Sequence, residues 1–407
     1  MDIGFRLTSK NKYSISRLYP LIGGKLFKNF EEIINNIKNN NLDILIYSFT
    51  TLSKGKIAKE IKEINKLKKL TKSNKPILIA GGAHPTGAPK DTIKMRFDYV
   101  VVGEGEITLP KIINKLKELD ENKDDKDDKN DRKELNEKII IGEQVINLDE
   151  FEKIEPLTPV EITRGCPYKC RFCQTPQIFG NNVRHRSIES ILKLTNPNTD
   201  TRVISPNAFC YGSKTGTLGK NSSSFCKSAN PSDSLRKPNI EKLEKLLKKL
   251  SEGKGKLFFG TFPSEVRPEF IQKDTIELVV KYCDNKFLHF GAQSGSDGML
   301  RYIRRGHTVD DVLNAVDLCR DYDLIPKVDF IFGFPNENEF HRKDSMELLH
   351  YIIKKNGRAH AHYFMPLPGT YFENQKPTVL DRKTLRALGQ LSQKGLVSGS
   401  WNYIPNI

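Results

Sequence analysis

The sequence Cys-Pro-Tyr-Lys-Cys-Arg-Phe-Cys at residues 166–173 directly follows a predicted strand at Pro159–Thr163. It gathers three of the seven cysteines, Cys166, Cys170 and Cys173, whereas the preceding part of the chain has none. Three thiolates at this spacing can hold one corner of a cuboidal iron–sulfur cluster, whose usual ligands are thiolates. Since four thiolates would close such a site, three leave one iron open to a small molecule.

Zinc is the main alternative for these three thiols. A structural zinc site usually has four Cys or His ligands, and His185 is the nearest histidine. The other cysteines, Cys210, Cys226, Cys283 and Cys319, are scattered along the chain. An iron–sulfur cluster is therefore the favoured hypothesis, ahead of a zinc knuckle or three unrelated core cysteines.

Strand-like and helix-like segments alternate from this strand onward, without a dinucleotide-type glycine fingerprint. This pattern predicts a partial or complete (β/α) barrel. The predicted strands are Pro159–Thr163, Thr201–Ser205, Lys256–Phe259, Phe287–Ala292, Lys327–Phe332 and Ala359–Met365. The predicted helices are Ser187–Leu194, Ile240–Leu250, Pro268–Lys281, Thr308–Tyr322 and Phe340–Lys355.

The same alternation occurs in the front part of the chain and predicts an α/β, doubly wound, parallel sheet of the Rossmann-like type. Ligands of such sheets bind at the carboxyl ends of the strands. The predicted strands are residues 1–7, Leu42–Ser48, Pro76–Ala80 and Asp98–Val102. The predicted helices are Asn29–Ile37, Gly55–Leu70 and Thr108–Leu119.

These patterns divide the chain into four parts: a front sheet domain at 1–120, a charged linker and hairpin at 121–150, a barrel at 151–375, and a C-terminal helix and tail at 376–407. Residues 120–138 are almost all charged and predict a solvated loop. Ile139–Leu148 is predicted to form the hairpin. The long segment Asn207–Pro238 is either a lid over a substrate or simply disordered.

The chain carries 66 Lys+Arg against 50 Asp+Glu, a formal charge of +16. The basic residues are diffuse, with acidic residues among them, so a nucleic-acid partner is an alternative that the pattern does not favour. No apolar run approaches the roughly 20 residues of a membrane span, and the N-terminus lacks a signal-peptide core. We therefore expect a cytoplasmic protein.

The cysteine triplet, with Phe172 before its last cysteine, resembles the radical S-adenosylmethionine (radical SAM) superfamily over about residues 158–372. The resemblance implies a 4Fe–4S cluster on Cys166, Cys170 and Cys173 whose fourth iron chelates S-adenosylmethionine. An electron donor such as ferredoxin or flavodoxin would drive cleavage to a 5′-deoxyadenosyl radical. That radical would abstract hydrogen from a substrate, small or macromolecular, which the sequence does not identify.

Further motifs resemble the superfamily in the expected order. They are Ser205-Pro206-Asn207, the sequence FPSEVRP at 262–268, GAQSGSD at 291–297, RRGHT at 304–308 and DFIFGFP at 329–335. Gln293 replaces a commoner glutamate. The resemblance implies cofactor-binding roles for Phe172, Ser205, Asn207, Glu265, Arg267, Gln293, Ser294 and Arg305. Arg267 and Arg305 both suit the methionine carboxylate, because a guanidinium can bind a carboxylate through two nitrogens.

The front part resembles the cobalamin-binding domain that precedes many radical SAM barrels. The matching motifs are GGAHPT at 81–86 and FDYVVVGEGE at 97–106, and the implied cofactor-binding residues are Ser48, Gly81, Gly82, Gly103, Glu104 and Gly105. Families that ligate cobalt through an imidazole carry a DxHxxG loop, whereas residues 17–24 contain no histidine. Cobalamin-dependent radical SAM methylases commonly lack that histidine too.

The resemblance favours a cobalamin-dependent methyltransferase that acts on an unactivated carbon. The alternative within enzymes is another radical reaction, such as ring rearrangement or RNA modification, with a front domain that lacks cobalamin. Methylthiotransferases share the RRGHT and GFP motifs, but they carry three front-domain cysteines that this chain lacks. An alternative of another class is a basic nucleic-acid-binding protein with a structural metal site.

Overall fold

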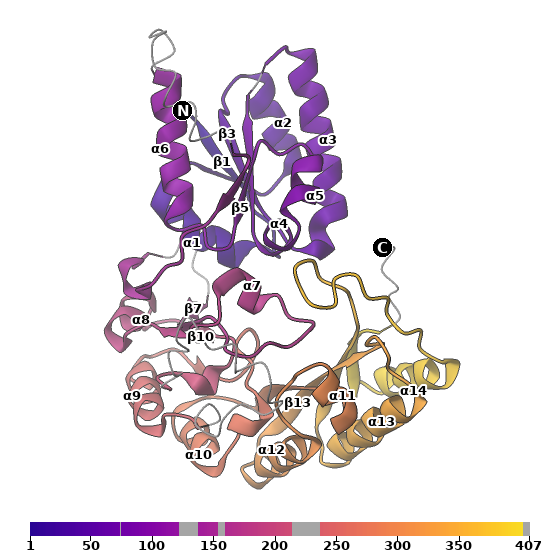
Figure 1. Cartoon of the computed structure of the whole chain (residues 1–407). Coiled ribbons are helices and arrows are strands. Elements are labelled where there is room, and N and C mark those ends of the chain that lie inside the picture. Colours follow the sequence, from indigo (N-terminus) through magenta and orange to yellow (C-terminus); the bar gives the residue numbers. More distant parts are fainter. Residues whose placement is uncertain (74, 122–136, 154–158, 214–236, 402–407) are drawn as a thin grey trace, which may run out of the picture. The chain divides into compact units, whose positions relative to one another are not determined.

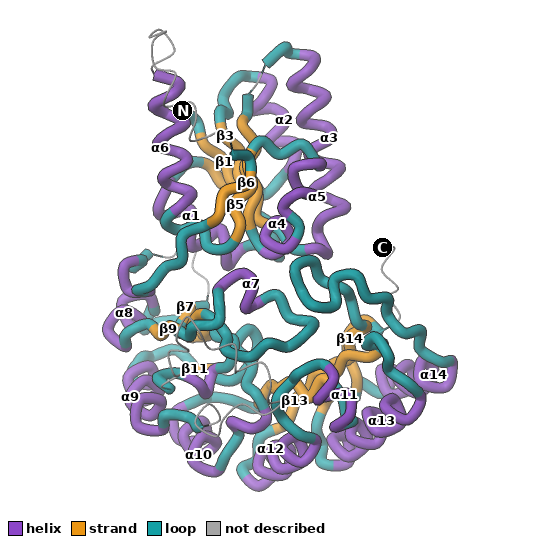
Figure 2. Tube along the Cα trace, viewed as in Figure 1, coloured by secondary structure: helices purple, strands orange, loops and turns teal. Residues whose placement is uncertain are grey.

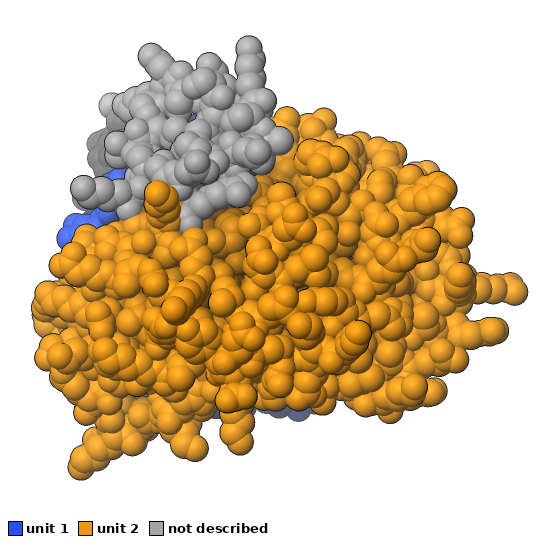
Figure 3. Space-filling model, turned by 90° about the horizontal axis from the view of Figure 1, so that it is seen from below, with its two compact units in different colours: residues 1–158, 177–179, 367–370 blue, residues 159–176, 180–366, 371–407 orange. Residues whose placement is uncertain are grey.

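The computed structural model describes residues 1–73, 75–121, 137–153, 159–213 and 237–401. These fall into two compact units, which Figure 3 colours separately. Unit 1 comprises residues 1–158 with 177–179 and 367–370, and unit 2 the rest. Most of the predicted charged linker, most of the predicted lid segment and Cys226 lie outside the described residues. No described helix is long and apolar enough to cross a membrane.

Unit 1 is built on a six-stranded parallel sheet with the strand order β2-β1-β3-β4-β5-β6, which confirms the predicted doubly wound sheet. The strands are β1 (Ile3–Arg6), β2 (Lys25–Phe27), β3 (Ile44–Ser48), β4 (Ile77–Gly81), β5 (Tyr99–Val102) and β6 (Ile139–Ile141). The helices are α1 (Lys12–Ile22), α2 (Phe30–Lys38), α3 (Lys54–Leu70), α4 (Ala83–Gly87), α5 (Pro89–Lys94) and α6 (Thr108–Glu121).

Helices cover both faces of this sheet (Figures 1 and 2). On one face α3 buries Ile57, Ile61 and Ile64, which are spaced as one stripe of a helix. On the other face α1 and α6 pack against β1 and β3 through a separate core cluster. Strands β1, β3, β4 and β5 are largely buried on both sides, so they are nearly continuous apolar runs, and this made them predictable.

Several elements of unit 1 differ from prediction. The predicted hairpin at Ile139–Leu148 is wrong, because Ile139–Ile141 instead pairs in parallel with β5 as the edge strand β6. The chain then passes through a 3₁₀ turn, η4 (Leu148–Glu150). Helix α1 and strand β2 were also not predicted. Both have few buried apolar residues, so periodicity gave little signal.

Unit 2 contains seven parallel strands, as two sheets of order β11-β10-β7 and β12-β13-β14-β15. The His289 amide donates to the Gly260 carbonyl at 2.9 Å, which brings β11 and β12 side by side. In the described residues β7 and β15 are not paired, so the barrel is partial. The strands are β7 (Val160–Glu161), β10 (Thr201–Ile204), β11 (Leu257–Phe258), β12 (Phe287–Gln293), β13 (Ile325–Phe332), β14 (Arg358–Tyr363) and β15 (Val397–Ser400).

Helices form the outer layer of this partial barrel (Figure 2). They are α8 (Ile188–Leu194), α9 (Ile240–Ser251), α10 (Lys273–Tyr282), α11 (Asp297–Tyr302), α12 (Val309–Asp321), α13 (Glu339–Lys354) and α14 (Arg382–Gln393). Every second residue of β13 is buried, as expected for a strand with one face against helices. An antiparallel pair, β8 (Thr163–Arg164) and β9 (Arg184–His185), flanks the cysteine segment and α7 (Thr175–Phe179).

Three predictions for unit 2 need correction. The first strand ends at Glu161, and Thr163 already belongs to β8. The predicted helix Pro268–Lys281 is a 3₁₀ turn, η8 (Pro268–Phe270), followed by α10. The C-terminal tail was predicted to be loose after one helix, yet Val397–Ser400 pairs with β14. That segment has one buried apolar residue, so main-chain pairing rather than side-chain pattern defines it.

A buried ion pair joins β1 to α3 in unit 1. Arg6 donates to both carboxylate oxygens of Glu60, at 2.8 and 3.0 Å, and the Tyr47 hydroxyl donates to the same carboxylate at 3.2 Å. Arg6 and Glu60 are 3% and 5% exposed. Removing one partner of such a pair leaves a buried charge without compensation.

We predict that Glu60→Gln lowers the free energy of unfolding by about 3–5 kcal/mol, because Arg6 then remains buried with its charge unpaired. Denaturant unfolding followed by circular dichroism measures the change. Glu63→Gln on the same helix is the matched control, since Glu63 is exposed. Equal stability of the two variants would contradict a structural role for the pair.

Candidate active-site pocket

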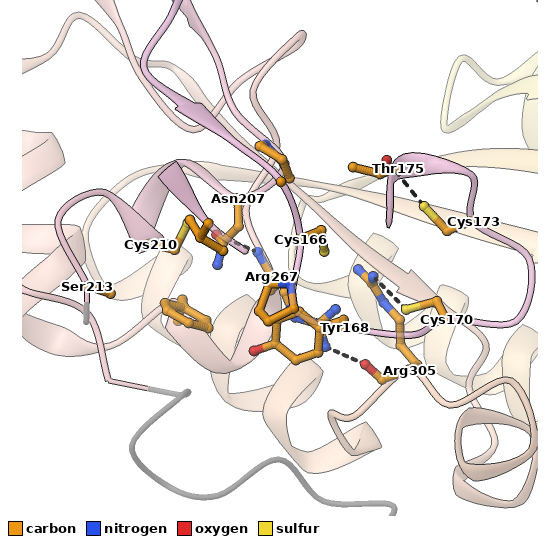
Figure 4. A pocket seen from close by; sticks show the side chains of 15 residues that line it. Cys166, Tyr168, Cys170, Cys173, Thr175, Asn207, Cys210, Ser213, Arg267 and Arg305 are labelled. Atoms are coloured by element: carbon orange, nitrogen blue, oxygen red, sulfur yellow. Dashed lines mark hydrogen bonds between the residues drawn. The ribbon is translucent and has the colours of Figure 1, made fainter. Parts of the chain in front are cut away.

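A pocket in unit 2 brings together distant segments of the chain (Figure 4). It is bordered by the cysteine segment, the turn after β10, the segment before η8 and the segment after α11. Six residues predicted from the sequence line it: Cys166, Cys170, Cys173, Asn207, Arg267 and Arg305. The cysteine triplet and three of the further motifs, those that contain Asn207, Arg267 and Arg305, therefore converge on one cavity.

The three cysteines lie in the loop between β8 and α7. The Cys173 thiol donates to the Thr175 hydroxyl at 3.3 Å, and an Arg305 Nη1 lies 3.9 Å from the Cys170 sulfur. Burial, with the charges of the other two cysteines, raises the pKa of Cys166 to about 12. Burial also raises the pKa of Cys173. Burial thus favours the neutral form of the Cys166 and Cys173 thiols, and a strongly cationic ligand would hold them as thiolates.

No three His, Cys, Asp or Glu side chains in the described part of the chain could hold a single metal ion. A cuboidal cluster requires a different arrangement of the sulfurs, because each cysteine binds a different iron. The three sulfurs need only surround a common volume. Cys166, Cys170 and Cys173 do this as walls of one pocket, so the donor set fits a cluster rather than a single ion.

Arg267 is the central side chain of the pocket wall. Its guanidinium lies 3.5 Å from the centre of the Tyr168 ring, pairs with Glu269 at 2.5 Å and donates to the Arg305 carbonyl. Its backbone amide donates to the Asn207 side chain at 3.3 Å. Arg267 thereby connects the other three segments around the pocket.

Three polar side-chain atoms that line the pocket are buried without a hydrogen-bond partner among the described residues: Tyr168 Oη, Asn207 Nδ2 and Arg305 Nε. Buried polar groups are nearly always paired, so each points to an absent ligand or water. The asparagine and arginine atoms are donors and suit a carboxylate. Together with the thiols, they fit the amino-acid end of S-adenosylmethionine beside an iron–sulfur cluster.

The structure gives other contacts to the remaining predicted residues of unit 2. The Phe172 ring packs on Phe334, 5.5 Å between centroids. The Ser205 hydroxyl donates to the Asn207 carbonyl at 2.8 Å and shapes the turn after β10. Ser294 lies 3.3 Å from the Ser345 hydroxyl of α13.

Two predicted polar residues also lie away from the lining. Gln293 ends β12 with a positive φ of 69°, at an irregularity in its pairing with β13. Glu265 hydrogen-bonds to the carboxyl of Asp329 on β13. His307, a helix-entry residue in the sequence motif, is buried with Nε2 3.1 Å from the Ala292 carbonyl.

Sequence reasoning missed several lining residues, including Tyr168, Thr175, Ser213 and Phe270. It also assigned Cys210 to the lid segment, whereas Cys210 ends a 3₁₀ turn, η5 (Ala208–Cys210), and lines the pocket. Burial and the charge of Cys166 raise the pKa of Cys210 to about 12. The Ser-Pro-Asn motif three residues earlier was the available signal for its position.

In unit 1 the strand order reverses between β1 and β3, which is where such sheets bind ligands. Asn11 closes this edge by donating to the carbonyls of Arg6 and Ser48, at 2.7 and 2.9 Å. The Ser48 hydroxyl lies 2.8 Å from the Ser14 hydroxyl. Ser48 is therefore at the predicted edge.

The other predicted cofactor residues of unit 1 have distinct surroundings. A Cβ at Gly82 would lie 2.7 Å from Ser48 Oγ, and φ is +95°, so glycine is required by packing there. Gly103 also has a positive φ, Gly105 packs near Leu18, and Glu104 accepts from the Val145 amide at 3.1 Å. Gly81 differs, because a Cβ there would meet only one atom, at 3.9 Å.

His84 is not available as a metal ligand in this conformation. Its Nδ1 lies 3.1 Å from the Thr51 hydroxyl and its Nε2 lies 3.2 Å from the Asp91 carboxylate. The ring stacks on Phe49 and is buried. The edge thus offers open backbone at Gly81 and no imidazole, which fits cobalamin bound without a protein ligand from this domain.

Two segments of the chain match known protein families. Residues 160–349 match the model of the Radical SAM superfamily, and residues 21–113 match that of the B12 binding domain. Among curated proteins, an uncharacterised protein of Methanocaldococcus jannaschii is 28% identical over 394 residues, covering 85% of this chain and 72% of the relative.

A second relative is the tRNA-2-methylthio-N(6)-dimethylallyladenosine synthase of Ehrlichia ruminantium strain Gardel. It is 23% identical over 374 residues, covering 89% of this chain and 76% of the relative. A candidate methylthiotransferase of M. jannaschii is 27% identical, but this chain spans only 62% of its length.

Solved structures share the fold. The radical S-adenosylmethionine methyltransferase TsrM of Kitasatospora setae, with cobalamin and a [4Fe-4S] cluster bound, has a TM-score of 0.63 at 12% identity, covering 91% of this chain and 77% of that one. The cobalamin-dependent S-adenosylmethionine radical enzyme OxsB has a TM-score of 0.60 at 16% identity, covering 99% and 59%. This chain belongs to the radical SAM superfamily, with a B12-binding domain ahead of its radical SAM domain.

Proposed function

We propose that this radical SAM enzyme is a cobalamin-dependent methyltransferase that acts on an unactivated carbon. The observation that carries the proposal is the unit 2 pocket, in which three cysteines lie beside unpartnered donors. The match to the B12 binding domain supports cobalamin as the second cofactor. The structural neighbours TsrM and OxsB are both described as S-adenosylmethionine enzymes with cobalamin bound.

In this proposal, different residues of the pocket bind the cluster and S-adenosylmethionine. Cys166, Cys170 and Cys173 would hold a 4Fe–4S cluster, and Asn207 and Arg305 would donate hydrogen bonds to the carboxylate of S-adenosylmethionine. When bound, the cluster with S-adenosylmethionine supplies a carbon radical, and cobalamin supplies a methyl group. The chain itself positions these groups and excludes water from them.

The front domain would hold cobalamin at the carboxyl edge of its sheet. Gly81 leaves room for a ligand against the backbone of β4, and Ser48 lies at the neighbouring strand end. Radical SAM enzymes also need a reductant. We propose a small electron carrier of the ferredoxin or flavodoxin type.

RNA modification is the second candidate, since curated relatives at similar identity are tRNA methylthiotransferase-type enzymes. The absence of any cysteine in residues 1–165 argues against sulfur insertion that uses a second cluster in the front domain. The third hypothesis, a binding protein with a structural metal site, has no support from the family assignment.

We predict that alanine at Cys166, Cys170 or Cys173 abolishes cluster assembly, because each thiolate would bind one iron. Iron analysis and visible absorbance after anaerobic reconstitution measure the loss from about four irons per chain. Cys210→Ala is the matched control, since Cys210 lines the same pocket. We expect it to retain full iron content, and loss of the cluster in that variant would indicate a site closed by four thiolates.

We predict that Gly81→Val weakens cobalamin binding about tenfold or more, because overpacking a close contact costs about 1–3 kcal/mol. Gly81 has room for a side chain and an ordinary φ, so the variant should fold. Equilibrium dialysis of cobalamin against the full chain measures affinity. Gly55→Val, at a glycine of α3 with nothing within 4 Å, is the control. Absence of cobalamin binding by the unmodified chain would remove the methyl-transfer proposal but leave the radical chemistry.

A further inference from the structure

The inner face of the partial barrel carries several polar side chains. A closed (β/α)₈ barrel usually fills its interior with branched apolar side chains. Here the residues that alternate with the buried ones on β12, β13 and β14 include His289, Lys327, Asp329, His360 and His362. A polar interior in a folded barrel calls for a polar ligand.

Arg202 on β10 is held in place at this face. Its Nη1 donates to the Thr261 hydroxyl at 3.0 Å and to the Phe262 carbonyl at 3.3 Å. Its guanidinium lies 4.2 Å from the centre of the Phe258 ring. These contacts use one nitrogen and one face of the group, so other N–H groups can still bind an anion.

His289 on β12 is fixed through the same turn. The Phe262 amide donates to its Nδ1 at 3.2 Å, so a neutral ring carries its proton on Nε2 and can donate there. Burial, together with the charges of Lys327 and Arg202, lowers the pKa of His289 to about 4. The ring therefore stays neutral in a locally positive region.

Lys327 on β13 is the register partner of His289. Among the described residues it has no ion pair within 4.0 Å. Asp329 lies two residues on. Burial and the neighbouring Glu265 raise the pKa of Asp329 to about 8, which weakens the negative charge of this carboxyl near neutral pH.

We propose that Arg202, His289 and Lys327 form a phosphate-binding subsite on the inner face of the barrel, which takes a phosphate-bearing organic substrate. Three donors from strands β10, β12 and β13, with no acceptor among them, match the three free oxygens of a phosphate monoester better than the two of a carboxylate. Phe262 links Arg202 to His289 and is 62% exposed, which leaves an apolar surface for the organic part. The inference rests on the proposed radical enzyme for the use of that substrate.

Equilibrium dialysis of radiolabelled inorganic phosphate against the full chain carrying its cluster tests the subsite, at constant ionic strength. We expect saturable binding that Lys327→Met and Arg202→Gln each weaken about tenfold, since each removes a charge-assisted hydrogen bond. Lys383→Met is the matched control, because Lys383 is an exposed residue of α14. It should bind phosphate as the unmodified chain does.

Unlabelled acetate at equal concentration should compete poorly. Three results would overturn the subsite: no saturable phosphate binding by the unmodified chain, equal binding by Lys327→Met, or acetate competing as well as phosphate. Iron content and cleavage of S-adenosylmethionine are measured separately on the same preparation. Failure of those two measurements would count against the proposed enzyme, whereas failure of phosphate binding alone would count against the subsite.

Discussion

The pocket of unit 2 depends on one buried charge, the guanidinium of Arg267. A charge that leaves water needs a partner, and Glu269 supplies it at 2.5 Å. The remaining contacts of Arg267 reach the Tyr168 ring, the Arg305 carbonyl and the Asn207 side chain. Each of those residues belongs to a different segment of the chain. The ion pair therefore fixes where the cysteine segment lies relative to the strand ends that would bind the cofactor.

This arrangement separates two arginines that the sequence motifs treat alike. Arg267 holds Glu269 and the Arg305 backbone and acts as a positioning residue. Arg305 reaches Cys170 and the Gly291 carbonyl, at 3.9 and 3.3 Å, and its Nε has no partner among the described residues. Arg305 is the one whose buried Nε lacks a partner among the described residues, and this donor suits the carboxylate of S-adenosylmethionine.

The order of the main strands and helices was predictable because each carries a strong local pattern. Leu42–Ser48 is a continuous apolar run, and Ile57, Ile61 and Ile64 mark a helix face. The edge strands β6 and β15 were not predictable, since their hydrogen bonds come from β5 and β14 rather than from their own side chains. In the pocket, the cysteine triplet was evident from spacing alone. Cys210 and Thr175 join it through folding of the loops, and no local pattern encodes that.

The parallel strands of the two units differ in where their apolar residues lie. This difference distinguishes the parts that support the fold from the parts that can bind a ligand. The unit 1 sheet is buried on both faces, so a ligand can reach its backbone only at the strand ends, where glycines such as Gly81 leave space. In unit 2, strands β12, β13 and β14 alternate buried residues with less buried ones, many of which are polar. Cofactor chemistry and substrate recognition therefore place different demands on the chain. The proposed cluster site needs three cysteines and a few hydrogen-bond donors. The proposed substrate subsite instead uses side chains of β10, β12 and β13.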